Sequence, residues 1–188
     1  MNRHLFLVKH SLPDIKQDLP ARAWHLSEEG RWRAARLAEI LKSYQPDFLA
    51  CSPEPKAVET AQIVAATCGV DFQVFEGLRE HERSATPYLS KSEFEEAVCQ
   101  FFEKPDTLVF GSETASQAHE RFSTAVSSVW TGRGNKKIMI VSHGTVIALF
   151  VSRLTGQPGY QIWSELGLPG FIVLDLESKE LVKLDNVL

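Results

Sequence analysis

Two short apolar segments, each followed almost at once by a histidine, constrain the fold more than any other feature of the sequence. Residues 5–8 come just before His10, and residues 138–141 come just before His143. Continuous apolar runs of this length are typical of strands that are buried on both faces of a parallel sheet. Because ligands bind at the carboxyl ends of the strands in open α/β sheets, we expect the two histidines to meet at one site.

The remaining segments predict how such a sheet is covered. Apolar residues at helical spacing alternate along the chain with further short apolar runs. Strands are expected at 47–51, 72–75, 171–176 and 181–184, helices at 27–43, 52–68, 90–103, 113–130 and 145–154, and a loop or short helix at 157–168. This alternation predicts an α/β fold in a single domain over residues 1–188, a three-layer sandwich with a mostly parallel central sheet and helices on both faces.

Local signals indicate where individual elements begin and end. Ser27 is a plausible N-cap for the first helix, and Ser52 can cap the second helix with Pro53 in its first turn. The last two strands are expected to form a terminal hairpin. Its outer strand would be a sheet edge open to pairing, so a homodimer is one expectation.

The composition limits the classes of function. The chain of 188 residues has a formal net charge of −4, which argues against general affinity for nucleic acid. No apolar run approaches the roughly 20 residues of a membrane helix, and the first residues show no signal-peptide pattern. The cysteines lack metal-ligand spacing and are expected to be reduced thiols. We therefore expect a cytoplasmic protein without a metal site and without nucleic-acid or membrane partners.

The polar residues at the strand ends belong to an ordered set of motifs. The set is Lys-His-Ser at 9–11, Leu-Ser-Glu-Glu-Gly at 26–30, Cys-Ser-Pro-Glu-Pro-Lys-Ala-Val-Glu-Thr-Ala at 51–61, Leu-Arg-Glu at 78–80 and Val-Ser-His-Gly at 141–144. In this order the motifs resemble those of the histidine phosphatase superfamily, the phosphoglycerate-mutase-like group. The resemblance covers nearly the whole chain, and the motifs are specific as a set although each alone is weak.

This resemblance implies a reaction and roles for individual residues. His10 would attack phosphorus and carry the phosphoryl group as a covalent phosphohistidine, and His143 would be the second histidine of the site. Glu80 falls on the position of the family's general acid, which later acts as base, while Glu82 remains a competing candidate. The implied activity is that of a hydrolase that needs no metal or cofactor and binds a small phosphorylated substrate or a phosphate ion.

The sequence departs from the family pattern at the residues that bind phosphate. Lys9 and Lys56 stand where the family has arginine, and Ser11 replaces a glycine, either to offer its hydroxyl to the phosphate or merely to fill the space. Lysine keeps the positive charge but loses the rigid two-donor geometry of arginine. Two interpretations stay open: a phosphomonoesterase with reduced activity, or a catalytically weak or inactive phospho-ligand binding protein on the same scaffold.

The length of the segment 77–111 bears on the type of phosphoryl transfer. It is too short for the large insert that helps the mutases of this family to retain the intermediate, so hydrolysis is favoured over mutase activity. A phosphatase of phosphohistidine on proteins is a third and weaker hypothesis. The physiological substrate is not encoded in any motif of the sequence.

Overall fold

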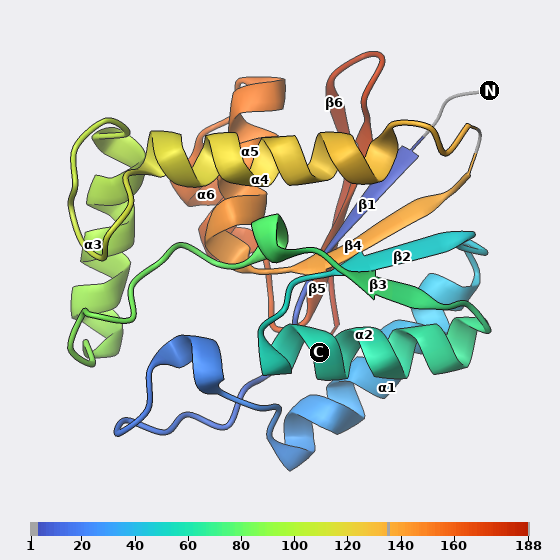
Figure 1. Cartoon of the computed structure of the whole chain (residues 1–188), viewed down its shortest axis with the longest axis horizontal. Coiled ribbons are helices and arrows are strands. Elements are labelled where there is room, and N and C mark those ends of the chain that lie inside the picture. The colour runs from blue at the N-terminus through green and yellow to red at the C-terminus, as the bar shows by residue number, and fades with distance from the viewer. Residues whose placement is uncertain (1–3, 135, 188) are drawn as a thin grey trace.

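The computed structural model describes residues 4–134 and 136–187, and in this part of the chain a six-stranded sheet lies between two layers of helices (Figure 1). The strands follow the order β3-β2-β4-β1-β5-β6 across the sheet. They are β1 (His4–Lys9), β2 (Phe48–Cys51), β3 (Phe72–Val74), β4 (Ile138–Ser142), β5 (Gly170–Asp175) and β6 (Glu180–Asn186). The first four are parallel, whereas β5 runs antiparallel to β1 and β6 antiparallel to β5. The predicted mostly parallel sheet with a terminal hairpin is confirmed.

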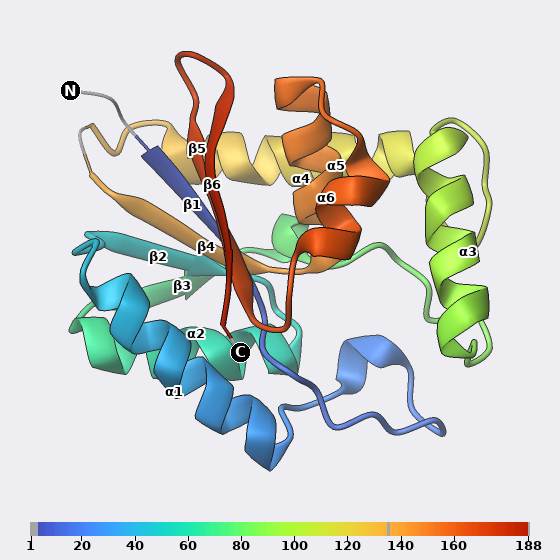
Figure 2. The same ribbon diagram turned by 180° about the vertical axis from the view of Figure 1, so that it is seen from behind.

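Helices cover both faces of this sheet, as predicted. They are α1 (Glu28–Lys42), α2 (Pro55–Cys68), α3 (Lys91–Glu103), α4 (Ala115–Trp130), α5 (Gly144–Thr155) and α6 (Gly159–Glu165), with short 3-10 turns η1 (Ala21–Ala23) and η2 (Glu76–Leu78). One layer contains α1 and α2, the other contains α4, α5 and α6, and α3 stands at one end of the molecule (Figures 1 and 2). Among the described helices none is both long and apolar enough to cross a bilayer.

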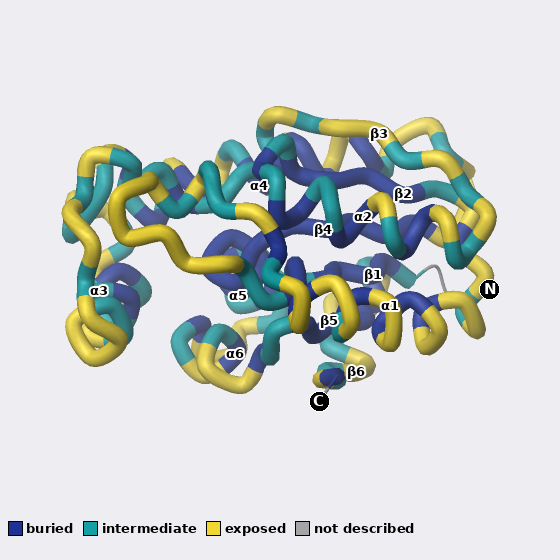
Figure 3. The backbone as a smooth tube through the Cα atoms, turned by 90° about the horizontal axis from the view of Figure 1, so that it is seen from below, coloured by how far each residue is buried: buried dark blue, intermediate teal, exposed yellow. Residues whose placement is uncertain are grey.

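The central strands are apolar along their whole length because they bury both faces. In β1, Leu5 and Leu7 belong to the core cluster that includes residues of α4 and α5, whereas Phe6 and Val8 belong to the cluster that includes residues of α1 and α2. This alternation follows from the two-residue period of a strand. The central strands accordingly form the buried middle of the molecule in Figure 3.

The register of β1 and β4 brings the two histidine segments together. Lys9 pairs with Ser142 in this parallel register, so the chain leaves both strands at the same edge of the sheet. The N–H of His10 donates to the carbonyl of Ser142 at 2.9 Å, which extends the pairing by one residue. His10 and His143 therefore follow the strands as close neighbours.

A glycine in the first turn of α1 fixes the loop that follows His10. A Cβ at position 30 would lie 2.0 Å from the carbonyl oxygen of Leu12, so only glycine allows this close approach. The backbone N–H and the hydroxyl of Ser27 both donate to the same carbonyl at 3.1 Å. Ser27 also accepts the N–H of Gly30 and is the N-cap of α1, as predicted.

The predicted start of the second helix is wrong by three residues. α2 begins at Pro55 with Glu54 at its N-cap position, and Pro53 lies outside the helix. Ser52 lies two residues before this N-cap. Its hydroxyl accepts the N–H of Glu54 at 3.2 Å and is hydrogen-bonded to the ring of His143 at 2.7 Å. A smaller difference is that α4 begins at Ala115 after a Thr114 capping box. The segment 157–168, expected to be a loop or a short helix, contains the short helix α6.

Candidate active site

Two histidine rings lie side by side at the carboxyl edge of β1 and β4. The ring centroids of His10 and His143 are 5.0 Å apart, in an edge-to-face arrangement. The two residues are 7% and 0% exposed, so they are almost completely removed from bulk water. The sequence analysis expected these rings at one site, and the structure places them together.

A backbone carbonyl fixes the tautomer of His10. Its Nδ1 lies 2.7 Å from the carbonyl oxygen of Ser11. Because a carbonyl only accepts hydrogen bonds, the proton resides on Nδ1 and Nε2 keeps its lone pair. Burial lowers the pKa of His10 well below 6.5, and the neighbouring His143 and Lys56 lower it further. His10 is therefore a neutral imidazole at pH 7 with a nucleophilic Nε2.

The second histidine is held by the residue that follows β2. Nε2 of His143 lies 2.7 Å from the hydroxyl of Ser52 and 3.5 Å from Oε1 of Glu54. Its Nδ1 is buried and has no hydrogen-bond partner among the described residues. Burial lowers the pKa of His143 well below 6.5, Lys56 lowers it further, and Glu80 acts in the opposite direction.

A buried carboxylate occupies the middle of the site. Oε2 of Glu54 lies 2.5 Å from the ammonium of Lys56, and Oε1 accepts the backbone N–H of Glu80 at 2.8 Å. The Lys56 ammonium also donates to the carbonyl of Ala21 at 2.7 Å. Burial lowers the pKa of Lys56, and the pairing with Glu54 opposes this shift. The sequence analysis missed Glu54, whose only signal is its position two residues before Lys56 in the second motif.

Lys9 approaches the same space from the side of α5. Its ammonium donates to the carbonyl of Leu166 at 2.7 Å. Burial lowers the pKa of Lys9 to about 8, against the opposing effect of Glu80. A Cβ on Gly144 would lie 3.0 Å from Cε of Lys9, so the glycine after the second histidine leaves room for the lysine stem.

Ser11 is locked by its backbone, and its side chain is left without a partner. Its N–H donates to the hydroxyl of Thr60 at 3.1 Å, and Thr60 donates in turn to the carbonyl of Lys56 at 2.7 Å. The Ser11 hydroxyl is fully buried and makes no hydrogen bond to any described residue. This geometry leaves the hydroxyl available to a ligand.

The two candidate acids lie in different surroundings. The carboxylate of Glu80 accepts the N–H groups of Thr145 and Val146 at 3.2 Å each, at the first turn of α5 next to His143. Burial acts to raise the pKa of Glu80, but His143, Arg83 and the N–H of His81 outweigh burial and lower it.

Glu82 makes its contacts away from the histidines. Its Oε1 accepts the N–H of Ser84 at 2.9 Å and the hydroxyl of Ser84 at 2.5 Å, and its Oε2 lies 3.7 Å from the guanidinium of Arg22. The structure thus places Glu80, not Glu82, against the backbone that follows His143.

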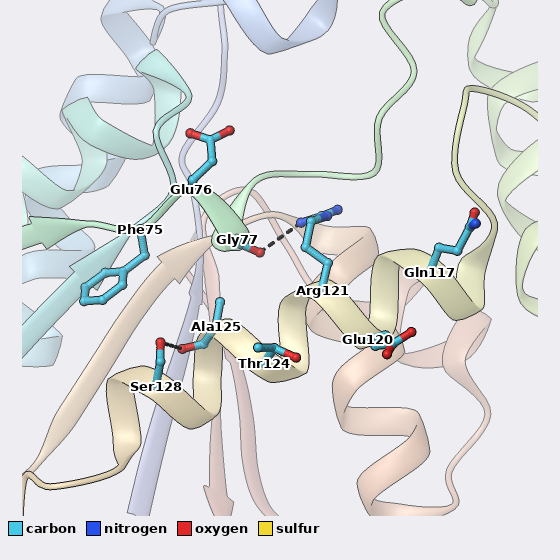
Figure 4. A pocket seen from close by; sticks show the side chains of 9 residues that line it. All are labelled: Phe75, Glu76, Gly77, Gln117, Glu120, Arg121, Thr124, Ala125 and Ser128. Carbon is cyan, nitrogen blue, oxygen red and sulfur yellow. Dashed lines mark hydrogen bonds between the residues drawn. The ribbon is translucent and has the colours of Figure 1, made fainter.

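Arg121 supports the segment that carries Glu80 from behind. Its guanidinium donates to the carbonyls of Gly77 and Arg79 at 2.9 Å and of Glu80 at 3.2 Å, and pairs with Glu113 at 2.6 Å. Figure 4 shows Arg121 directed toward the carbonyl of Gly77, at a shallow hollow between η2 and α4. No predicted site residue lines this hollow. Arg121 acts on the site through the backbone that it holds and through its charge, which lowers the pKa of His143.

A further arginine, missed by the sequence analysis, adds positive charge to this site. The guanidinium carbon of Arg83 lies 4.4 Å from the ring centroid of Phe94, and its Nη1 is buried without a hydrogen-bond partner among the described residues. Arg83 lowers the pKa of Glu80, His143 and Lys56, so its charge is felt at all three groups. Its place three residues after Glu80, in a segment without periodicity, gave no sequence signal.

These groups form what we call the central cluster, made of His10, His143, Lys9, Lys56, Glu54, Glu80 and Arg83. The cluster combines a neutral nucleophile, cations and a carboxyl group, which suits phosphoryl transfer without a metal. In the described part of the chain no group of three or more His, Cys, Asp or Glu residues is placed to hold a metal ion.

Comparison with known proteins gives one family and several relatives. The profile of the histidine phosphatase superfamily (branch 1) matches residues 10–183. The chain is 29% identical over 136 residues to phosphoglycerate mutase-like protein 4 of Arabidopsis thaliana, and this alignment spans 68% of the chain but only 59% of the plant protein. It is 23% identical over 141 residues to an uncharacterized phosphatase of Bacillus subtilis, covering 75% and 67% of the two chains.

Solved structures share the fold over nearly the whole chain. Phosphoserine phosphatase from Entamoeba histolytica, in complex with 3-phosphoglyceric acid, superimposes with a TM-score of 0.80 at 19% identity over 98% of both chains. A mycobacterial glucosyl-3-phosphoglycerate phosphatase in complex with VO3 gives a TM-score of 0.76 at 21% identity over 92% of both chains. At this level of identity the likeness shows a common fold.

Proposed function

Since the chain belongs to the histidine phosphatase superfamily (branch 1), we propose that it hydrolyses a small phosphomonoester through a phosphohistidine at His10. The observation that carries the proposal is the pair of contacts at this residue. Nδ1 donates to the carbonyl of Ser11 at 2.7 Å, and the ring lies 5.0 Å from that of His143 in a buried site. A neutral imidazole oriented in this way is prepared to attack with Nε2.

In the first step Nε2 of His10 attacks phosphorus and the ester P–O bond breaks. The leaving oxygen takes a proton from the carboxyl group of Glu80. His143, Lys9 and Lys56 stabilise the negative charge on the phosphoryl oxygens. In the second step Glu80, now a carboxylate, takes a proton from a water molecule that attacks phosphorus. The P–N bond breaks, phosphate leaves and His10 regains its lone pair.

The protonation of Glu80 is coupled to substrate binding in this scheme. Without a ligand its pKa is lowered, because His143, Arg83 and the N–H of His81 outweigh burial, so Glu80 is a carboxylate at pH 7. A phosphate dianion beside it is a like charge and raises its pKa again. Glu80 therefore takes up a proton as substrate binds, and it then has the proton that the leaving group needs.

Lys9 and Lys56 take the two positions where the family motif has arginine, and we propose that both bind the phosphoryl group as lysines. Each ammonium has three donors. Lys9 donates one hydrogen bond to Leu166, and Lys56 donates two, to Glu54 and Ala21. The donors that remain reach phosphate as single hydrogen bonds, which predicts a weaker hold on the transition state than arginine would give.

Turnover of an aryl phosphate tests this function. We expect release of phosphate by the wild-type protein and a loss of at least about a hundredfold in His10→Ala, because the covalent step is removed. His119→Ala is the matched control, because His119 lies on α4 hydrogen-bonded to Ser123 and makes no contact with the central cluster. Turnover that survives in His10→Ala would rule out His10 as the nucleophile.

A second candidate function is binding of a phosphorylated ligand with little or no turnover. The contacts that favour it are those of the two lysines, which already donate to Leu166, Ala21 and Glu54. Saturable binding of inorganic phosphate by wild-type protein that releases no phosphate from aryl or alkyl phosphates would support this alternative. Release of phosphate that depends on His10 would exclude it.

A further inference from the structure

We propose that Arg83 binds the phosphoryl group of the substrate and supplies the two-donor contact that neither Lys9 nor Lys56 can make. The inference rests on the proposed function, because it concerns the same site. It adds a binding residue that the motifs of the sequence do not contain. Its support comes from the hydrogen bonding, the charge balance and the packing of Arg83.

One donor atom of the Arg83 guanidinium is buried and has no partner among the described residues, while the residue as a whole is half-buried. Nη1 has no partner, and no hydrogen bond or ion pair of the side chain is found among residues 4–134 and 136–187. Leaving a buried charged donor unsatisfied is costly, and the large majority of buried polar side-chain atoms in folded proteins have a hydrogen-bond partner. The other buried arginine nearby, Arg121, instead uses its donors on Glu113 and on backbone carbonyls. Arg83 is thus equipped to bind an anion.

The charge balance of the central cluster requires this arginine. Lys9 and Lys56 bring two positive charges, which Glu54 and Glu80 cancel while both are carboxylates. A neutral cluster offers a phosphate dianion no net attraction in a buried site. Arg83 adds a third positive charge to the cluster. Burial lowers the pKa of its guanidinium and Glu80 and Glu54 oppose this shift, and the guanidinium is charged at neutral pH.

Arg83 follows Glu80 by three residues along the chain. Its charge acts on Glu80, Glu54, Lys56 and His143, whereas the ammonium of Lys9 is bonded to the carbonyl of Leu166. A guanidinium beside Glu80 can bind two phosphoryl oxygens at once, because its N–H groups form a planar fork.

The surroundings hold the guanidinium in place before any ligand arrives. It lies on the face of Phe94, whose ring makes edge contacts with two further aromatic rings. The centroid-to-centroid distances are 6.2 Å to Phe110 and 5.8 Å to Trp163. The backbone on one side is fixed because the N–H of Glu82 donates to Glu113 at 2.9 Å. A pre-oriented arginine loses little conformational entropy on binding, which suits a role in recognition.

Binding of inorganic phosphate, measured by titration calorimetry, tests the inference without requiring turnover. The variants are Arg83→Met, which removes both the charge and the planar pair of N–H donors, and Arg83→Lys, which keeps only the charge. The control is Arg36→Lys on the outer surface of α1, whose guanidinium also stacks on an aromatic ring, 5.0 Å from the centroid of Trp32. Thermal unfolding of each variant checks that it folds.

We expect the affinity for phosphate to be at least about tenfold lower in Arg83→Met than in the wild type. The affinity of Arg83→Lys should lie between these two values, and that of Arg36→Lys should equal the wild-type value. Wild-type affinity in both Arg83 variants would overturn the inference while leaving the phosphohistidine mechanism intact. Weakened binding in Arg83→Met together with turnover that persists in His10→Ala would instead support Arg83 and contradict the proposed function. Absence of phosphate binding by the wild-type protein would contradict both.

A second readout separates ligand binding from a structural role. Arg83 lowers the pKa of Glu80, so its removal raises that pKa. Because the first step needs protonated Glu80, the alkaline limb of the pH profile of kcat/KM for an alkyl phosphate should move to higher pH in Arg83→Met and stay in place in Arg83→Lys. A profile that is identical in wild type and Arg83→Met would contradict a guanidinium next to the acid.

Discussion

Oε2 of Glu54 lies 2.5 Å from Nζ of Lys56, so a buried ion pair occupies the site that we assign to a phosphate. The same carboxylate accepts the N–H of Glu80 at 2.8 Å and lies 3.5 Å from Nε2 of His143. Glu54 thus joins a cation, the acid segment and the second histidine. Glu54 also neutralises Lys56 and repels an incoming phosphate. The carboxylate that orders the site therefore lowers its affinity for an anion.

We predict that Glu54→Gln strengthens competitive inhibition by inorganic phosphate about threefold to tenfold, because the charge that opposes the anion is removed. The amide oxygen can still accept the N–H of Glu80, but the buried Lys56 loses its counter-charge. The free energy of unfolding should therefore fall by about 1–3 kcal/mol in the absence of phosphate. Inhibition constants and urea unfolding measure the two effects.

Glu59→Gln is the matched control for this prediction. Glu59 lies on the same helix and pairs with His25 and Arg31, outside the central cluster. Its replacement should leave phosphate inhibition unchanged. Phosphate that binds more weakly to Glu54→Gln than to the wild type would show that Glu54 positions the site more than it repels the anion.

Because the pKa of Lys9 is lowered, we predict that the affinity for phosphate falls in mildly alkaline solution. Burial lowers the pKa of its ammonium to about 8, so the group loses its positive charge as the pH rises through this value. The inhibition constant of phosphate should therefore rise from pH 7 to pH 9.5, although phosphate itself becomes more negatively charged over this range. In Lys9→Arg, whose side chain keeps its charge, the rise should disappear. An equal rise in both proteins would assign the effect to another group.

We predict that replacement of Arg121 lowers the catalytic rate without weakening substrate binding. It holds the carbonyls of Gly77, Arg79 and Glu80, so Arg121→Met should loosen the segment that carries the acid. We expect kcat for an alkyl phosphate to fall about tenfold to a hundredfold with little change in KM, because small displacements of a catalytic group are costly. Arg133→Met, which removes donors to backbone carbonyls at the end of α4, should leave kcat unchanged. Equal kcat values for the two variants would contradict the role of Arg121.

We predict that the loop after His10 keeps its position only while residue 30 has no side chain. In Gly30→Ala the new Cβ meets the carbonyl oxygen of Leu12 at 2.0 Å, so the loop must move and turnover should fall together with stability. Gly69→Ala is the control, because Gly69 has a φ of +70° and open space around it. It should lose about 1 kcal/mol of unfolding free energy and keep its activity. Full activity in Gly30→Ala would show that the loop position does not matter.

The sheet could be predicted because its central strands leave little choice. The runs 5–8 and 138–141 are apolar at every position, and they prove to be buried on both faces. The order of strands and helices then restricts the topology. The placement of His10 and His143 at one edge follows from the parallel pairing of Lys9 with Ser142.

The details of the central cluster could not be predicted, because they depend on contacts between distant parts of the chain. Ser52 carries a local capping signal, but its hydroxyl bonds to His143, which is 91 residues away. Glu54 and Arg83 have no periodic pattern around them, and their roles follow from the direction of their side chains. The roles of Lys9 and Lys56 also depend on how many donors their backbone partners leave free, which no motif encodes.

The identity of the phosphorylated atom tests the central claim most directly. Rapid quenching of the wild-type protein with an aryl phosphate, followed by peptide mapping under alkaline conditions, locates the phosphoryl group on the chain. We predict an acid-labile, base-stable label on His10, attached to Nε2 because Nδ1 donates to the carbonyl of Ser11. A label on Nδ1 of His10, on Ser11 or on any other residue during turnover would contradict the mechanism.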